Sequence, residues 1–202
     1  MLNILNQFDT QLFLWLNQLH APWLDPIMWF FSLTKVWIPF YLLLAGWIVY
    51  YYRRMSWVIL IAIGLTIFLS DRISSGIIKP AVCRLRPSHE PSLQHRVHIV
   101  NDYRGGKYGF VSSHAANSFA LAMFLSLLFK RRRWIILFFL WAFLVSYSRI
   151  YLGVHYPGDI VGGALVGIGC SLIVFWGLRH LPGSYRLMEN QSFKSEKNTP
   201  VS

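Results

Sequence analysis

Residues 57–78 of the chain read WVILIAIGLTIFLSDRISSGII, and this stretch decides the fold class. A helix needs about 20 mainly apolar residues to cross the hydrocarbon core of a membrane, and this segment meets that requirement. Its two charged residues, Asp71 and Arg72, are adjacent in the sequence. Because an isolated charge in lipid is costly, we expect them to face protein or lie near the interface, most simply as a buried pair. The stretch predicts a transmembrane helix.

Four further apolar segments lie on either side of this stretch, at residues 36–52, 115–129, 134–147 and 160–178. The segments at 115–129 and 134–147 have short cores and need their flanks to cross a bilayer. The 202 residues are 55% hydrophobic and only 13% charged, whereas a soluble domain usually has roughly 25% charged residues. The sequence therefore predicts an all-α integral membrane protein, a bundle of about five to six transmembrane helices. Small residues in the last segment favour close helix packing within the bundle; they are Gly158, Gly162, Gly163 and Gly167.

The first 35 residues form a different kind of segment. Apolar side chains recur there at helical spacing among polar ones: Phe8, Leu12, Phe13, Leu16 and Leu19. This pattern predicts an amphipathic helix lying in the membrane interface. Residues 23–33 follow Pro22 and are too short to cross alone, so they either lie in the interface or extend the first span. We expect residues 1–35 to be interfacial, residues 36–180 to form the transmembrane bundle, and residues 181–202 to be a polar, disordered cytoplasmic tail.

The basic residues are clustered rather than spread, although the formal net charge is +11. A uniformly basic surface would favour nucleic acid, whereas clusters at the ends of apolar runs favour membrane topology and an anionic ligand. We therefore expect no nucleic-acid partner. Arg53 and Arg54 join the first two spans, and residues 130–133, KRRR, join the third and fourth. The positive-inside rule places both turns in the cytoplasm.

Three polar clusters occupy the segments on the side opposite to these basic turns. They are KPAVCRLRP at residues 79–87, then Ser112, Ser113 and His114, and then Ser148, Arg149, His155 and Asp159. The first follows the second span, the second precedes the third span, and the last lies between the fourth and fifth spans. Chance placement would scatter such clusters, so their agreement predicts one site on one face of the membrane.

The residue types in these clusters are suited to phosphate chemistry. Lys79, Arg86 and Arg149 supply the cations that hold a phosphate group. Serines just before an apolar helix supply a cap, and the free N–H groups there attract anions. Because the fixed cations can neutralise the transition state, no metal is required.

Two histidines can divide the work of phosphoryl transfer. One neutral imidazole attacks phosphorus, while the other donates a proton to the leaving oxygen and later activates water. Asp159 stands four residues after His155, and a carboxylate in that position can fix the tautomer of a catalytic histidine. Three more histidines, His89, His95 and His98, lie on the long loop, but their spacing does not match a metal site.

Lys79-x6-Arg86-Pro87, Ser112-x-His114 and Ser148-Arg149-x5-His155-x3-Asp159 resemble the three signatures of the type 2 phosphatidic acid phosphatase (PAP2) superfamily. This resemblance implies a metal-independent, all-helical membrane enzyme with a catalytic bundle and a site near the outer leaflet. It also implies that His155 is the nucleophile, that Asp159 orients it, and that His114 is the acid–base partner. By the same resemblance Lys79, Arg86, Ser112 and Arg149 bind phosphate, and Ser113 contributes its backbone N–H.

One signature departs from the usual pattern of the family. Where the family has Pro-Ser-Gly-His, this chain has Val111, Ser112, Ser113 and His114. A side chain therefore stands where glycine allows close approach, and we expect this to change the pocket dimensions more than the reaction. The run RPSHE at residues 86–90 is similar to small bacterial members that act on undecaprenyl diphosphate.

The leading hypothesis is a multi-pass lipid phosphatase of the bacterial inner membrane, with its site facing the periplasm or the cell exterior. Its expected reaction is hydrolysis of undecaprenyl diphosphate to undecaprenyl phosphate through a phosphohistidine. Phosphatidylglycerophosphate, phosphatidic acid and lipid A remain alternative substrates, and a lipid-phosphate binder without catalysis is an alternative of another class. The expected partners are the lipid substrate and membrane lipids, and no cofactor is expected. The sequence does not predict the oligomeric state.

Overall fold

A computed structural model describes residues 2–181, so all but the first residue of the predicted tail at 181–202 lies outside the described residues. The described chain is helical, and its only strand-like feature is an isolated bridge between Leu85 and Tyr108. The α-helices are α1 (Leu2–Gln18), α2 (Asp25–Ser32), α3 (Ile38–Tyr52), α4 (Ser56–Asp71), α5 (Lys79–Val82), α6 (Ser113–Phe129), α7 (Arg132–Tyr151) and α8 (Pro157–His180). The predicted all-α class is confirmed.

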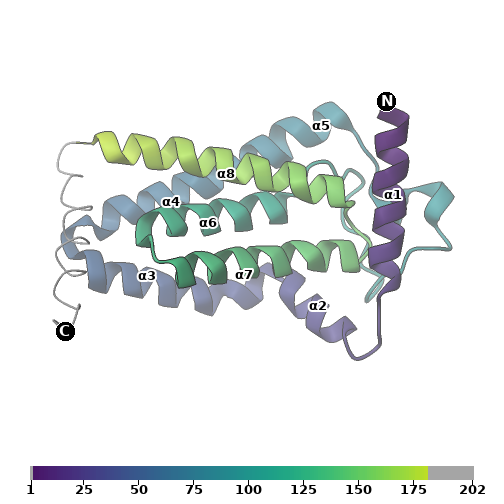
Figure 1. Ribbon diagram of the computed structural model, residues 1–202, viewed down its shortest axis with the longest axis horizontal. Coiled ribbons are helices and arrows are strands. Elements are labelled where there is room, and N and C mark those ends of the chain that lie inside the picture. The colour runs from purple at the N-terminus through teal and green to yellow at the C-terminus, as the bar shows by residue number, and fades with distance from the viewer. Residues whose placement is uncertain (1, 182–202) are drawn as a thin grey trace, which may run out of the picture.

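Three segments of the described chain are long and apolar enough to cross a membrane: Thr34–Val82, Arg132–Tyr151 and Pro157–Arg179. Ser113–Phe129 is a shorter apolar helix. The first segment turns back at Arg53–Met55, so it contains α3 and α4 as a hairpin, and α4 continues through a π-helical stretch, Arg72–Ile78, into α5 (Figure 1). The five predicted spans therefore correspond to α3, α4 with its extension, α6, α7 and α8.

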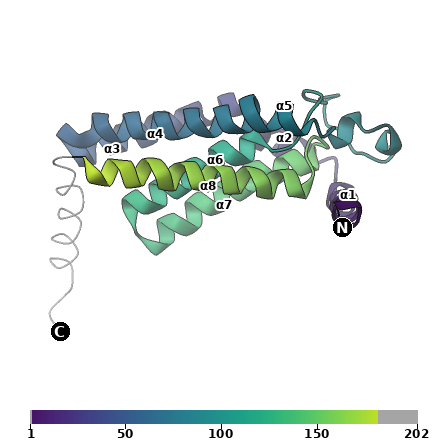
Figure 2. The ribbon, with the colours of Figure 1, turned by 90° about the horizontal axis from the view of Figure 1, so that it is seen from above.

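Helix α6 lies between α4, α7 and α8 and forms the centre of the bundle (Figure 2). Its side chains Phe124 and Leu125 are fully buried in one apolar core with Ile48 of α3 and Ile59 of α4. Close contact between α6 and α8 depends on glycine. A Cβ atom on Gly167 would overlap the carbonyl oxygen of Ala116 on α6, so the predicted packing of small residues is confirmed.

Helix α1 crosses one end of the bundle rather than running along it (Figure 1). Phe13 is buried against Ile150 and Tyr156. The buried Asn17 amide donates to the carbonyl oxygen of Tyr151 at 2.8 Å and accepts from the backbone N–H of His98 at 2.7 Å. These contacts fix α1 to the loops at that end.

Several other apolar side chains of α1 are exposed, including Ile4, Phe8 and Trp15, and so is Leu19 just after the helix. The helix is therefore amphipathic with two apolar faces, one against the bundle and one open. An open apolar face at the end of a transmembrane bundle suits the head-group boundary. The interfacial position of residues 1–35 stays a prediction.

The structure differs from the sequence-based expectation at the end of α4 and at α2. Asp71 and Arg72 are both exposed, and the Arg72 guanidinium lies over the Phe68 ring at 5.4 Å, so the predicted buried pair is wrong. The pair ends α4 close to Lys79, where long side chains can reach the interface and need no mutual burial. Helix α2 is separated from α3 by the 3-10 turn Thr34–Trp37 and packs against α7, so residues 23–33 do not simply lengthen the first span.

Candidate active site

The three polar clusters meet at the end of the bundle that α1 crosses (Figure 1). That end holds the start of α5, the start of α6, the end of α7 and the start of α8. The turns at Arg53–Met55 and at Lys130 lie at the opposite end. The predicted gathering of the clusters on one face, away from the basic turns, is therefore found in the structure.

His155 and Asp159 form a fully buried pair at the start of α8, with 1% and 0% of their surfaces exposed. The helix begins at Pro157, which suits a first turn, and Asp159 projects back toward the preceding residues. Its Oδ2 lies 3.2 Å from His155 Nδ1 and accepts from the Tyr156 backbone N–H at 3.1 Å. Because Nδ1–H donates to the carboxylate, Nε2 is the nitrogen left with a lone pair.

The surroundings of His155 favour its neutral form. Burial lowers the pKa of His155 well below its usual value, and the charges of Arg86, Arg149 and Lys79 lower the pKa further. A neutral imidazole with a free Nε2 can act as a nucleophile near neutral pH.

Arg149 and Arg86 are buried cations, and neither forms a salt bridge with a carboxylate within residues 2–181. Arg149 is 2% exposed, and its hydrogen-bond partners are the hydroxyl groups of Ser32 and, at 3.2 Å, Tyr103. Arg86 is 8% exposed and its Nε donates to the Tyr108 carbonyl oxygen at 3.1 Å. Arg149 Nε and Arg86 Nη1 have no hydrogen-bond partner in the described chain.

Burying a charge without a partner is costly, so proteins rarely retain two such groups side by side. Burial, with the nearby charge of Arg149, lowers the pKa of Arg86 from its usual value. An anion placed between the two guanidinium groups would satisfy their unused N–H donors and offset their repulsion. The geometry therefore indicates an anion site.

Pairing between two loop segments places Arg86 beside the His155–Asp159 pair. The Arg86 backbone N–H donates to the Lys107 carbonyl oxygen at 3.2 Å, and the Gly109 N–H donates to the Arg84 carbonyl oxygen at 2.8 Å. A Cβ on Gly109 would lie 2.9 Å from Asp159 Oδ2 and 3.2 Å from Arg86 Cγ. Glycine is needed at this position because any larger residue would push the loop away from the site.

Ser112 caps α6, as the sequence predicts. Its hydroxyl accepts from the Ala115 backbone N–H at 3.4 Å, and its own N–H donates to the Asp159 carbonyl oxygen at 2.9 Å. Ser113, the residue that departs from the family pattern, makes a contact that glycine could not make. Its Oγ accepts from Lys79 Nζ at 2.9 Å and lies 2.7 Å from Ser75 Oγ. The extra hydroxyl therefore holds the ammonium group of Lys79 at the start of α6.

His114 is the second residue of the same helix, and its Nε2 lies 3.5 Å from Thr34 Oγ1. Arg149, Lys79 and His155 are close enough to His114 to act on it electrostatically. All eight residues predicted for the site, from the three clusters, are therefore gathered at one end of the bundle. No group of three or more metal-binding side chains occurs among residues 2–181.

Four residues at this site were not assigned to it from the sequence: Asp9, Ser32, Arg84 and Tyr103. Arg84 lies inside the first cluster, but Asp9, Ser32 and Tyr103 come from α1, α2 and the long loop. Nothing in their local sequence indicates a contact with residues so distant in the chain. Only the tertiary structure brings them to Arg149 and Asp159.

Known proteins resemble this chain in both sequence and fold. A model of the PAP2 superfamily matches residues 56–181. The chain is 45% identical over 186 residues to a lipid A 4'-phosphatase of Bacteroides thetaiotaomicron, covering 89% of this chain and 80% of that protein. It is 30% identical over 172 residues to an undecaprenyl-diphosphatase of Sulfolobus acidocaldarius, covering 82% and 76%. The crystal structure of Aquifex aeolicus LpxE matches with a TM-score of 0.62 at 27% identity, covering 82% of this chain and 93% of that one.

Proposed function

The chain belongs to the PAP2 superfamily and is a membrane lipid phosphatase, and from this premise we propose that it transfers the terminal phosphate of a lipid to water through a phosphohistidine at His155. The observation that carries the proposal is the pair of buried guanidinium groups, Arg86 and Arg149, which have unused N–H donors at the same site as the buried His155. A phosphate group has the charge and the acceptor oxygens that these donors need.

The first half of the reaction forms a covalent intermediate. The lone pair of His155 Nε2 attacks phosphorus, and the bond from phosphorus to the lipid oxygen breaks. His114 donates a proton to that oxygen, so the lipid leaves as an alcohol or as a shorter phosphate. Asp159 holds Nδ1–H of His155 and stabilises the positive charge that develops on the ring. The fixed cations neutralise the charge on the equatorial oxygens.

The second half regenerates the enzyme. Neutral His114 takes a proton from water, and the oxygen of that water attacks the phosphorus of the intermediate. The bond from phosphorus to Nε2 then breaks, and inorganic phosphate leaves. Both halves use only Lys79, Arg86, Arg149 and the α6 N-terminus for charge neutralisation, and no metal or cofactor takes part.

Two lipid classes are supported as substrates. The identity to the lipid A 4'-phosphatase is higher than the identity to the undecaprenyl-diphosphatase and extends over most of both chains. It supports a phosphate monoester on a glycolipid as the substrate. The weaker relation to an undecaprenyl-diphosphatase supports the diphosphate that the sequence motifs favoured. We propose the lipid A class as the first substrate and undecaprenyl diphosphate as the second. We further propose a bacterial inner membrane location with the site facing outward, because the basic turns lie at the opposite end.

The test is a substrate panel with purified protein in detergent and EDTA present. Lipid A, undecaprenyl diphosphate, phosphatidylglycerophosphate and phosphatidic acid are compared by kcat/KM for phosphate release. We expect the highest value for lipid A, and loss of at least roughly 1,000-fold in His155→Ala. Normal turnover by His155→Ala would disprove the phosphohistidine, and loss of wild-type activity with EDTA would disprove the metal-free reaction. Binding of these lipids without turnover by the wild-type protein would favour a non-catalytic role.

A further inference from the structure

Arg84 stands in the first cluster but belongs to none of the three signatures. Its guanidinium forms two ion pairs: Nη1 lies 2.9 Å from Asp159 Oδ1, and Nη2 lies 2.7 Å from Asp9 Oδ2. The guanidinium carbon also lies 4.0 Å from the centroid of the Tyr156 ring. The side chains of Arg84 and Asp9 are only 21% and 15% exposed, so water screens these pairs less than it screens surface pairs.

Asp9 connects this guanidinium to two helices. It lies on α1, and its Oδ1 accepts from the Gly158 backbone N–H at the start of α8 at 2.7 Å. A Cβ on Gly158 would lie 2.7 Å from Asp9 Oδ2, so glycine permits this close approach. The two oxygens of Asp9 therefore fasten α1 to both Arg84 and α8.

We propose that Asp9 and Arg84 are positioning residues for the His155–Asp159 pair and connect α1 to the nucleophile. The two oxygens of Asp159 have separate tasks: Oδ2 accepts from His155 and Oδ1 accepts from Arg84. Arg84 fixes the rotation of this carboxylate, which keeps Oδ2 aligned with Nδ1 of His155. Asp9 holds Arg84 in place. This inference rests on the proposed function, since it takes His155 as the reacting group.

Two substitutions at Arg84 separate its charge from its shape. Arg84→Gln should lower kcat at least roughly tenfold with KM changed less than about twofold. Arg84→Lys keeps the charge but loses the two-pronged guanidinium geometry, so it should recover part of that kcat at an unchanged KM. An unchanged kcat in Arg84→Gln would overturn the proposal.

Asp9→Asn keeps an oxygen for the Gly158 N–H and removes the ion pair with Arg84. We expect it to lower kcat several-fold on its own and less than about twofold in the Arg84→Gln background, because both changes break one chain of contacts. A full additional loss in the double variant would show that Asp9 does not act through Arg84. The matched controls are Asp102→Asn and Arg96→Gln on the exposed loop, which should keep wild-type kinetics.

The same series includes His155→Ala. If that variant is active, the proposed function fails. If it is inactive while Arg84→Gln and Asp9→Asn behave like wild type, only the positioning proposal fails. Melting temperature in detergent is measured for every variant, and a variant that unfolds is replaced by Arg84→Lys or Asp9→Glu in the same assay.

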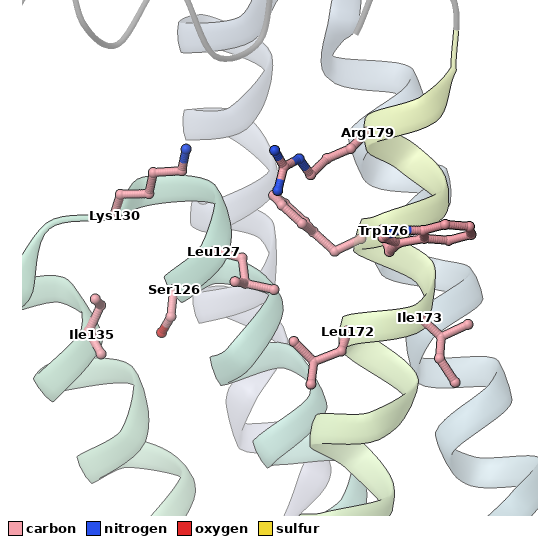
Figure 3. A pocket seen from close by; sticks show the side chains of 9 residues that line it. Ser126, Leu127, Lys130, Ile135, Leu172, Ile173, Trp176 and Arg179 are labelled. Atoms are coloured by element: carbon pink, nitrogen blue, oxygen red, sulfur yellow. The ribbon is translucent and has the colours of Figure 1, made fainter. Parts of the chain in front are cut away.

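The opposite end of the bundle has a cavity of about 790 Å³ between α6, α7 and α8, and its walls include Leu127, Ile135 and Leu172 (Figure 3). Lys130 and Arg179 lie at the upper end of the cavity in that view. This cavity is separate from the His155–Asp159 pair and from the contacts of Asp9 and Arg84.

Discussion

Tyr103 is one of the neutral groups that hold the Arg149 guanidinium, which has no carboxylate partner among the described residues. Its hydroxyl accepts from Arg149 Nη2 at 3.2 Å, and the Arg149 guanidinium carbon lies 5.3 Å from the ring centroid. Burial raises the pKa of Tyr103, but the charge and hydrogen bond of Arg149 more than offset this, so its pKa is lowered overall. The phenol thus compensates part of the charge of Arg149 without being a full counter-ion.

Tyr103→Phe removes the hydrogen bond and keeps the ring. We expect KM for the lipid phosphate to rise about 10-fold to 150-fold, the equivalent of one hydrogen bond to a charged group of about 1.5–3 kcal/mol. The measurement is steady-state phosphate release, with Tyr108→Phe as the matched control because that residue contacts Arg86 through its backbone. A KM within error of wild type would show that the hydroxyl does not position Arg149 for binding.

The pH dependence of the reaction follows from the environment of His155. Burial and the charges of Arg86, Arg149 and Lys79 lower its pKa, so in the folded protein the neutral form persists below the usual value of about 6.5. Because proton uptake abolishes the nucleophile, kcat/KM should stay high as the pH falls through 6.5 and decline only at lower pH. In the unfolded chain His155 has its usual pKa, so stability is also lost as the pH falls below about 6.5.

This prediction is checked by measuring kcat/KM across the acid range. The ionisation of the substrate phosphate is determined by phosphorus NMR under the same conditions, since a monoester also titrates near pH 6. An acid limb at or above pH 6.5 that does not coincide with the substrate titration would contradict the lowered pKa.

At the scale of single residues, the sequence predicted the contacts that are local and left out those that are not. His155 and Asp159 are four residues apart around a helix start, so their pairing could be inferred from spacing. Asp9 lies 75 positions before Arg84, which reaches it only because α1 crosses the end of the bundle. No local pattern specifies that crossing. The role of Ser113 was missed for a related reason, since its partners Lys79 and Ser75 belong to another helical segment.

At the scale of elements, the apolar runs predicted the helices well, because a bilayer permits few ways to satisfy a buried backbone. The expected span at 134–147 is the inner part of α7, which begins at Arg132 and ends at Tyr151. The difference arises because Ser148 and Arg149 are polar in sequence yet buried at the site. Hydropathy therefore underestimates the length of α7. The apolar pattern stops at the polar residues of the site, although the helix continues through them.

The contact between α6 and α8 offers a matched pair of glycines for a stability test. A Cβ on Gly167 would overlap backbone atoms of α6, whereas a Cβ on Gly169 would meet nothing within 4 Å. Gly167→Ala should destabilise the fold by about 1–3 kcal/mol through overpacking. Gly169→Ala should be neutral or stabilise it by up to about 1 kcal/mol through helix propensity. Thermal unfolding in detergent checks both variants. Equal melting temperatures of Gly167→Ala and Gly169→Ala would show that α6 and α8 can move apart to admit the methyl group without loss of stability.

For the whole molecule, the arrangement of charges and clusters predicts which side of the membrane each end of the bundle faces. The turns at Arg53–Met55 and Lys130 lie at one end and the candidate site at the other. Since basic turns stay in the cytoplasm, the site end should face outward. Cys83 is exposed at the site end and Cys170 is buried in α8, so the natural chain carries its own reporter of sidedness.

A membrane-impermeant maleimide should therefore label Cys83 in intact spheroplasts without permeabilisation. Cys83→Ser should abolish that label, because the thiol of Cys170 is covered by the bundle. In the Cys83→Ser background, Arg132→Cys at the start of α7 should be labelled only after the membrane is opened. The reverse pattern at the two positions would place the site in the cytoplasm, and it would exclude lipids confined to the outer leaflet as substrates.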